Sequence, residues 1–134
     1  MRLDRAMCIE DLRRIARRNV PGVFFEYMEA GSYSEATRDA NVADMRAIKL
    51  RQRVLVDMSQ RSLKTTVLGE ELALPLAIAP TGLSGMQYAD GEIHACRAAH
   101  AAGIQYTLST MSICSIEDVA EAVQKPFWFQ LYMM

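Results

Sequence analysis

Apolar residues recur at helical spacing near the beginning of the chain. In residues 9–19 they occupy one face while arginines occupy the other, a pattern typical of a helix that packs on one side. The apolar positions are Ile9, Leu12, Ile15 and Ala16. Asn19 and Pro21 indicate the end of this helix, and a second short helix is predicted from Pro21 to Glu29, ending before Gly31.

No single period dominates the next stretch. Residues 32–48 are mixed and polar, which fits either a helix or a loop over the surface. Residues 50–58 and 63–68 are typical of extended segments, and Gly69-Glu70-Glu71 offers a turn between strands. The first half of the chain therefore predicts helices followed by a hairpin.

From residue 74 onward, short apolar runs alternate with helical patterns. Residues 74–80 are almost wholly apolar, as in a strand that is buried on both faces. Asp90 is placed to cap a helix that runs to Ala102 and ends at Gly103, and residues 104–109 form the next predicted strand.

A second helix and a third strand follow. Ser115-Ile116-Glu117-Asp118 resembles a capping box, Lys125-Pro126 ends the helix, and residues 127–132 begin the strand. Alternating strands and helices with short joints predict parallel strands in an α/β fold. Periodicity alone leaves open whether the strands form an open sheet or part of a closed barrel.

Composition is that of an ordinary globular protein. The 134 residues are 51% hydrophobic and 23% charged, with a net charge of −1, so no basic surface favours nucleic acid. The three cysteines lack the spacing of a zinc site and are expected to be reduced thiols, with Cys96 and Cys114 in or near the core; the third is Cys8. No apolar run is long enough to cross a membrane. We therefore expect a cytoplasmic protein and no metal site.

Polar residues follow each of the three predicted parallel strands, at the ends where α/β folds bind ligands. Gly82 allows the backbone to approach a flat ligand closely, and Ser109 and Gln130 can hydrogen-bond a ring that bears carbonyls and nitrogens. Tyr132 can hold a carboxylate. The alternative is that these side chains only bond to backbone.

The order of the motifs resembles the N-terminal part of the FMN-dependent 2-hydroxy-acid oxidase and dehydrogenase family, and within it the bacterial L-lactate dehydrogenases that pass electrons to the respiratory chain. The resemblance covers the chain from about residue 9 onward. In chain order the motifs are Phe25-Glu26-Tyr27, Gly31, Ser32-Tyr33-Ser34-Glu35, Leu50-Arg51-Gln52-Arg53-Val54-Leu55, Ala79-Pro80-Thr81-Gly82-Leu83, Gly91-Glu92, Ala98-Ala99, Ala102-Gly103, Thr107-Leu108-Ser109-Thr110 and Phe129-Gln130-Leu131-Tyr132.

This resemblance implies a fold and a set of site residues. The chain would be the N-terminal portion of a (β/α)8 TIM barrel: helices and a hairpin in residues 1–73, then the first β/α units of the barrel in residues 74–134, as one partial domain. The residues that match the family's FMN contacts are Pro80, Thr81, Gly82, Ser109 and Gln130, and those that match its substrate contacts are Tyr27 and Tyr132. An aromatic packing role is the alternative for Tyr27.

The resemblance also implies oxidation of a small L-2-hydroxy acid, L-lactate above all, to the 2-oxo acid, with a quinone of the respiratory chain or oxygen as electron acceptor and a homo-oligomer as the full-length enzyme. The family's proton-accepting histidine would lie beyond residue 134, so we expect no catalytic residue in this chain and no activity from it alone. His94 and His100 are not expected to replace it, since they share one helix and neither follows a strand.

Three further features carry alternatives. A partner-binding or assembly module without catalysis is the second hypothesis for the chain itself. Arginines in residues 13–18 form a solvated helix face, with peripheral contact to the inner face of the membrane left open. Asp90-Gly91-Glu92 suggests an acid cluster, but helix capping explains it. Residues 81–85 lack the Gly-rich pattern of a nucleotide-binding phosphate loop.

Overall fold

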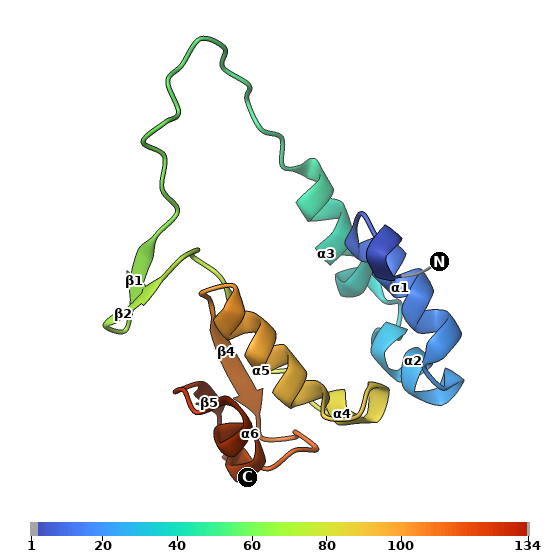
Figure 1. The fold of residues 1–134 in the computed structure, drawn as a ribbon. Helices are drawn as coiled ribbons and strands as arrows, with labels where there is room; N and C mark the ends of the chain where they lie inside the picture. Colours follow the sequence, from blue (N-terminus) through green and yellow to red (C-terminus); the bar gives the residue numbers. More distant parts are fainter. Residues whose placement is uncertain (1–2, 134) are drawn as a thin grey trace. The chain divides into compact units, whose positions relative to one another are not determined.

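The computed structural model describes residues 3–133, and the chain divides into two compact units, Met1–Arg61 and Ser62–Met134. The hairpin therefore falls in the same unit as the parallel strands (Figure 1). Each unit is described below by itself.

The first unit contains helices. A 3-10 turn covers Leu3–Arg5, and the helices are α1 (Ile9–Asn19), α2 (Gly22–Glu29) and α3 (Ala36–Ala47). The two helices predicted before Gly31 are thus confirmed, and residues 32–48 contain a helix. Phe25 of α2 is buried at 4% exposure, and the Arg17 guanidinium lies 5.8 Å from the centre of its ring.

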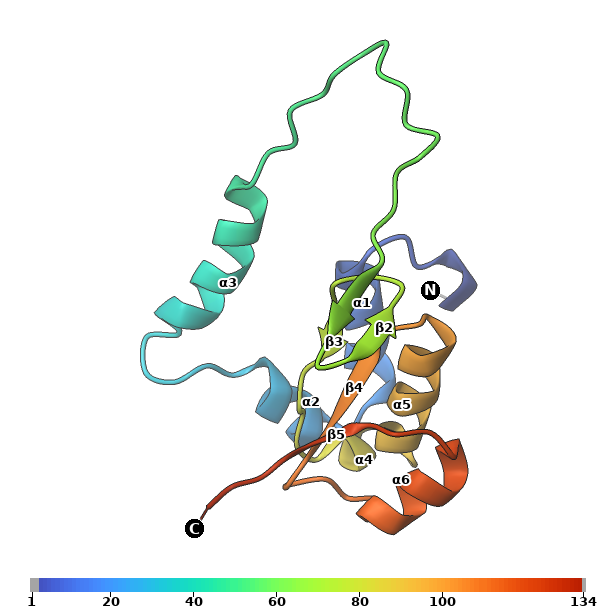
Figure 2. The ribbon, with the colours of Figure 1, turned by 90° about the vertical axis from the view of Figure 1, so that its left-hand side faces the viewer.

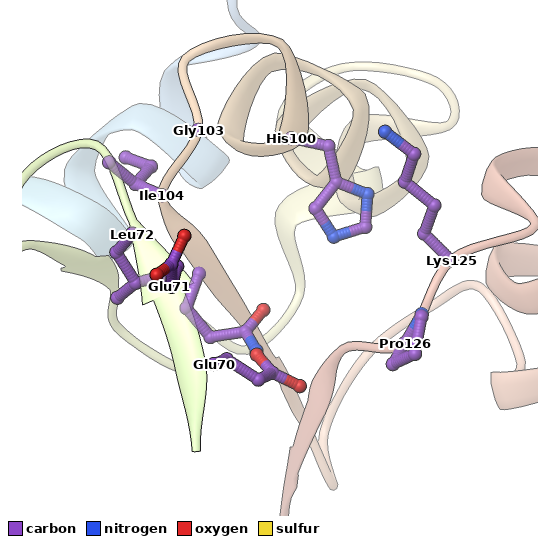
Figure 3. A pocket seen from close by; sticks show the side chains of 9 residues that line it. Glu70, Glu71, Leu72, His100, Gly103, Ile104, Lys125 and Pro126 are labelled. Carbon is purple, nitrogen blue, oxygen red and sulfur yellow. The ribbon is translucent and has the colours of Figure 1, made fainter. Parts of the chain in front are cut away.

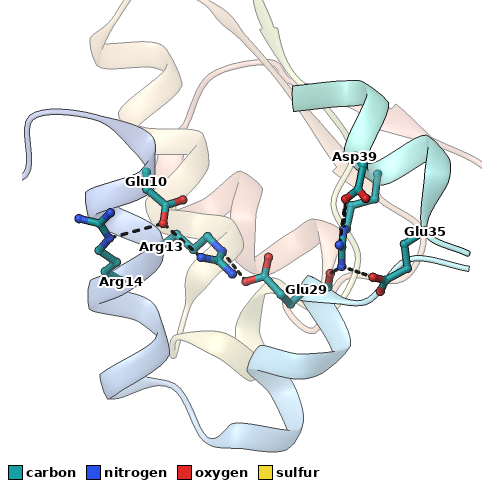
Figure 4. A network of polar contacts seen from close by, with 7 residues as sticks. Glu10, Arg13, Arg14, Glu29, Glu35 and Asp39 are labelled. Atoms are coloured by element: carbon teal, nitrogen blue, oxygen red, sulfur yellow. Dashed lines mark hydrogen bonds and ion pairs between the residues drawn. The ribbon is translucent and has the colours of Figure 1, made fainter. Parts of the chain in front are cut away.

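An ion pair and a hydrogen bond to the backbone connect the three helices of this unit (Figure 4). Arg13 of α1 donates through Nε to Glu29 of α2 at 2.7 Å. Arg38 of α3 pairs with Glu35 at 2.7 Å and donates to the Glu29 backbone carbonyl at 3.2 Å. The carboxylate of Glu29 raises the pKa of Arg13. These groups are largely exposed, so water and salt screen their attraction.

The hairpin is shorter than the sequence pattern suggests. Strand β1 (Thr65–Val67) pairs antiparallel with β2 (Glu70–Leu72), and residues 50–58, predicted to be extended, belong to no strand. Leu68 and Gly69 both have positive φ, as a two-residue hairpin turn requires. The turn precedes Glu70 because Glu70 already pairs with Val67.

Parallel strands and two crossover helices make up most of the second unit. Along the chain the elements are β3 (Ala77–Ile78), α4 (Ser84–Gln87), α5 (Gly91–Ala101), β4 (Gln105–Ser109), α6 (Ile116–Val123) and β5 (Trp128–Gln130). The strands lie in the order β3-β4-β5, and both pairs are parallel. Figure 2 shows β4 together with α5 and α6 of the same unit. The predicted α/β alternation is confirmed.

Both crossover helices cover one face of β4. Tyr106 and Leu108 point to the same face because side chains alternate along a strand, and both belong to the core cluster together with Cys96, Ala99 and Val119. Ser109 lies on the opposite face and is also buried, at 3% exposure. The strand therefore separates the packed core from the polar residues at its end.

Two predictions of detail are wrong. The 74–80 strand was expected to be buried on both faces, but β3 has only two residues, both exposed. Among the described residues it pairs only with β4, so its other edge has no neighbour. Asp90 occupies the N-cap of α5 in a left-handed conformation and its side chain makes no capping hydrogen bond.

Two helix signals are confirmed. Ser115 and Asp118 form the predicted capping box at the start of α6. Gly103 follows α5 with a φ of +69°, and a Cβ there would lie 2.8 Å from the Cβ of Ala73. The glycine is required both by its backbone conformation and by this contact.

Candidate functional site

The predicted site residues of the second unit gather at the carboxyl ends of the three parallel strands. Residues 79–83 follow β3, Thr110 and Met111 follow β4, and Gln130 ends β5. Because the strands are parallel and adjacent, their carboxyl ends share one edge of the sheet. Side chains from these three segments therefore lie close together.

Ser109 and Gln130 are in contact across β4 and β5. Their residues are register partners in the ladder, and the Ser109 hydroxyl donates to Gln130 Oε1 at 3.4 Å. The Thr110 amide donates to the same oxygen at 3.4 Å. With its oxygen occupied in this way, the Gln130 amide directs its two N–H donors elsewhere, where a ligand can accept them.

Thr110 has a structural role that sequence reasoning missed. Its hydroxyl donates to the Gln130 backbone carbonyl and accepts from the Tyr132 amide at 3.1 Å. One side chain thus fixes the backbone on both sides of Leu131. The sequence offered one signal for this role, a threonine beside a serine at the end of a strand. The Tyr132 amide that Thr110 binds, however, lies 22 residues further along the chain.

Gly82 lies against the loop that follows β4. A Cβ at Gly82 would approach the Cβ of Met111 to 3.1 Å and the Ser109 hydroxyl to 3.8 Å. The Leu83 amide donates to the Met111 carbonyl at 2.9 Å. Pro80 and Thr81 are exposed, and the Thr81 hydroxyl donates to the Ala79 carbonyl at 3.3 Å. The close backbone approach predicted for Gly82 is made, within this chain, to Met111.

The two predicted substrate tyrosines belong to different units. Tyr132 follows β5 and is 52% exposed, with its backbone held by Thr110. Tyr27 lies in α2 of the first unit and is 64% exposed. Within that unit the buried aromatic residue is Phe25, and the substrate role and the packing role of Tyr27 both stay predictions.

Glu92 is a buried residue whose role the sequence interpretation missed. It is fully buried in α5, and its Oε1 accepts from the Gly85 amide at 3.0 Å and from the Ile113 amide at 3.1 Å. Burial alone would raise the pKa of Glu92, but the backbone donors hold it below its ordinary value. Capping of its own helix therefore does not explain this carboxylate, because it accepts from one amide of α4 and one amide of the loop that follows β4.

The thiols of this unit are not activated. Burial raises the pKa of Cys96, and burial together with the hydrogen bond to Glu92 raises the pKa of Cys114 to about 11. A thiol with such a pKa stays protonated at neutral pH and is a poor nucleophile or metal ligand. The expected core and near-core thiols are found, Cys96 being buried and Cys114 half-buried.

The histidines lie elsewhere in the second unit. His100 borders a hollow of about 350 Å³ at the amino ends of β4 and β5, opposite the predicted ligand end, and its Nδ1 is buried without a partner (Figure 3). Glu70 of the hairpin accepts there from Gln105 at 2.6 Å. The His94 ring packs edge-on against Tyr88, with centres 5.6 Å apart.

The described residues contain neither a metal-binding group nor a membrane-spanning helix. Within residues 3–133, no group of three or more His, Cys, Asp or Glu side chains comes together in a metal-binding arrangement. In the same part of the chain, no helix combines the length and apolar character needed to cross a bilayer.

Comparison with known proteins connects this geometry to a family. A family model described as FMN-dependent dehydrogenase matches residues 16–134. An L-lactate dehydrogenase of Stenotrophomonas maltophilia is 52% identical over 124 residues, which is 92% of this chain and 33% of that protein. One of Chromohalobacter salexigens is 51% identical over 92% of this chain and 32% of its own length.

A solved structure agrees with this relationship. The chain is similar to a monotopic membrane protein, (S)-mandelate dehydrogenase, with a TM-score of 0.87 and 38% identity over 96% of this chain and 34% of that one. The chain thus spans about a third of the length of the proteins it matches. These matches confirm the resemblance seen in the motifs, and the chain belongs to the FMN-dependent dehydrogenase family.

Proposed function

We propose that this chain is the N-terminal portion of a (β/α)8 barrel that oxidises a small L-2-hydroxy acid, L-lactate above all, with FMN as cofactor. The observation that carries the proposal is the alignment of Ser109 with Gln130 on adjacent parallel strands, beside the Gly82 loop. The identity of 52% to an L-lactate dehydrogenase supports the choice of substrate.

The donor set of this strand edge suits a flavin ring. Such a ring presents carbonyl oxygens and ring nitrogens, and Gln130 offers N–H donors while Ser109 offers a hydroxyl. Pro80, Thr81 and Gly82 would lie along the ring with little side-chain bulk at Gly82. When bound, FMN would supply an acceptor for two electrons from the substrate.

Tyr132 and Tyr27 are the proposed substrate contacts. The phenol of Tyr132 is accessible, and its backbone is fixed by the Thr110 hydroxyl, so it can donate to a carboxylate or to the substrate hydroxyl. The proton acceptor of the reaction is not proposed among residues 1–134. We do not assign that role to His94 or His100, since neither follows a strand.

Partners follow from the same assignment. We infer a quinone of the respiratory chain or oxygen as electron acceptor, and a homo-oligomer as the full-length form. Cytoplasmic residence with peripheral attachment to the inner membrane face is supported by the arginine-rich face of α1, whose arginines outnumber its acidic residues and would favour anionic headgroups, and by the similarity to a monotopic dehydrogenase.

A hybrid enzyme tests the proposal. The chain is joined to the part of the Stenotrophomonas relative that follows its matched 124 residues. We expect a yellow protein whose visible absorption L-lactate bleaches, with the Ser109→Ala and Gln130→Ala hybrids binding FMN more weakly. The unmodified 134-residue chain, given FMN and L-lactate, is expected to show no bleaching. A folded hybrid that does not bind FMN would refute the proposal.

An assembly module is the second candidate, and the exposed strand edges favour it. Among the described residues, β3 and β5 each pair only with β4, and apolar side chains beside them are exposed: Leu76 at 58%, Phe129 at 42% and Leu131 at 64%. This candidate predicts that the chain captures the separately produced remainder of the relative without catalysing oxidation. Lactate-dependent bleaching by the reconstituted pair would exclude it.

A further inference from the structure

One buried carboxylate joins the loops that follow β3 and β4. Glu92 is fully buried, and a single oxygen, Oε1, accepts from both the Gly85 and the Ile113 amides. Gly85 lies in the first turn of α4, three residues after Gly82. Ile113 lies between β4 and α6, two residues after Met111. Glu92 therefore connects the backbone of two strand ends.

The space around this carboxylate is tightly filled. A Cβ at Gly85 would lie 2.7 Å from the Cβ of Ile113 and 3.1 Å from Glu92 Oε2. A Cβ at Gly91 would lie 2.7 Å from the carbonyl oxygen of Ser84. Gly85 thus lies directly against the Ile113 side chain, Gly91 lies against the backbone of Ser84, and small residues are needed at both positions.

The ionised carboxyl of Glu92 provides a hydrogen-bond acceptor for backbone amides that have none nearby. The residue at the N-cap of α4, Leu83, provides no side-chain cap, so the Gly85 amide needs an acceptor from elsewhere. Backbone donors at the start of a helix favour a negative charge. A buried carboxylate is costly unless hydrogen-bonded, which makes simple space filling by this side chain an inadequate explanation.

We infer that Glu92 is a positioning residue for the flavin site: it holds the backbone of residues 80–82 at a fixed place beside Ser109 and Met111. The inference rests on the proposed function. Glu92 acts through the backbone that it binds and does not itself contact the ligand, because its side chain is fully buried and accepts from the Gly85 and Ile113 amides. The bond from the Leu83 amide to Met111 is the second connection between the same loops.

Three variants of the hybrid enzyme test the inference. Glu92→Ala removes the acceptor of both amides, Glu92→Gln keeps an oxygen for them, and Val119→Ala removes part of a fully buried side chain of α6 that contacts neither amide. We expect Glu92→Ala to weaken FMN binding at least about tenfold and to shift the flavin absorption band, because two part-buried amides lose their partner.

The other two variants separate positioning from stability. Glu92→Gln should bind FMN within about threefold of the unmodified hybrid, since both hydrogen bonds can re-form. Val119→Ala should lower the midpoint of urea unfolding while FMN affinity and absorption stay unchanged. Unchanged FMN affinity and spectrum in Glu92→Ala would overturn the inference, whereas an unmodified hybrid without FMN would overturn the proposed function instead.

Gly85→Ala provides a second route if Glu92→Ala fails to fold. It retains the carboxylate but places a methyl group 2.7 Å from the Ile113 Cβ, so the two loops must separate. We expect FMN affinity to fall about tenfold or more in this variant, with the same change in absorption. Normal affinity in folded Gly85→Ala would overturn the inference.

Discussion

Each of the two units of this chain is stabilised internally by a different kind of contact. Among residues 3–61, Phe25 is the only buried residue. An ion pair from Arg13 to Glu29 connects α1 to α2, and a hydrogen bond from Arg38 to the Glu29 carbonyl connects α3 to α2. Within the second unit, Leu108 and Val119 are fully buried, and hydrogen bonds fix the loops at the strand ends. The first unit therefore depends on solvent-screened contacts, while the second contains a core of its own.

The most severe change is expected at Leu108, at the centre of the second unit's core. Leu108→Ala should reduce the free energy of unfolding by about 2–5 kcal/mol, because a fully buried leucine leaves a cavity. Urea unfolding followed by the fluorescence of Trp128, the one tryptophan, measures this. Leu63→Ala, at a side chain 64% exposed, is the matched control and should be nearly silent.

A smaller loss is expected at the start of α6. Ser115→Ala removes the hydroxyl that accepts from the Asp118 amide, which should cost about 1 kcal/mol of unfolding free energy. Ser115→Thr retains a hydroxyl and should restore most of it. Equal destabilisation by both variants, again followed at Trp128, would contradict the capping role.

The same capping box predicts a weak dependence on pH. Hydrogen bonds from Ser115 lower the pKa of Asp118. A carboxyl with a lowered pKa in the folded state stabilises the protein above its unfolded pKa, near 3.9, and this contribution is lost as the pH falls through the folded value. Asp118→Asn should therefore flatten the acid side of the stability curve slightly, measured as urea midpoints at successive pH values.

The smallest effect is expected in the first unit. Arg13→Gln removes the ion pair to Glu29, so the helical circular dichroism should melt at a slightly lower temperature in dilute buffer. At about 1 M salt, where the screening length is roughly 3 Å, the difference from the unmodified chain should vanish. A difference that persists in salt would show that the aliphatic part of Arg13, and not its charge, provides the stabilisation.

Local patterns predicted most of the elements. The spacing of Ile9 and Leu12 identified α1, Ser115 and Gly103 identified helix ends, and the alternation after residue 74 identified the parallel strands. These signals work because they act within a few residues of each other. The exposure of β3 and the absence of a strand in residues 50–58 depend instead on which strands are available as neighbours.

Part of the candidate site could also be predicted, because strand ends are known places for ligands. Ser109, Gln130 and Gly82 were found in this way, and the structure brings them to one edge. Glu92 and Thr110 were missed, since one partner of Glu92 lies 21 residues away and one partner of Thr110 lies 22 residues away, and no local pattern marks such a bond. Glu92 was explained by capping of its own helix, whereas it accepts from the amides of Gly85 and Ile113.

The order of strands in the parallel sheet has a consequence for synthesis. β3, β4 and β5 lie beside one another in the order in which they leave the ribosome, joined by α4 and α5 and then by α6. Every strand can thus pair with its predecessor as soon as it emerges, without waiting for a distant segment. A growing chain can extend the sheet one strand at a time. The newest strand is then always the edge strand with which the next one pairs.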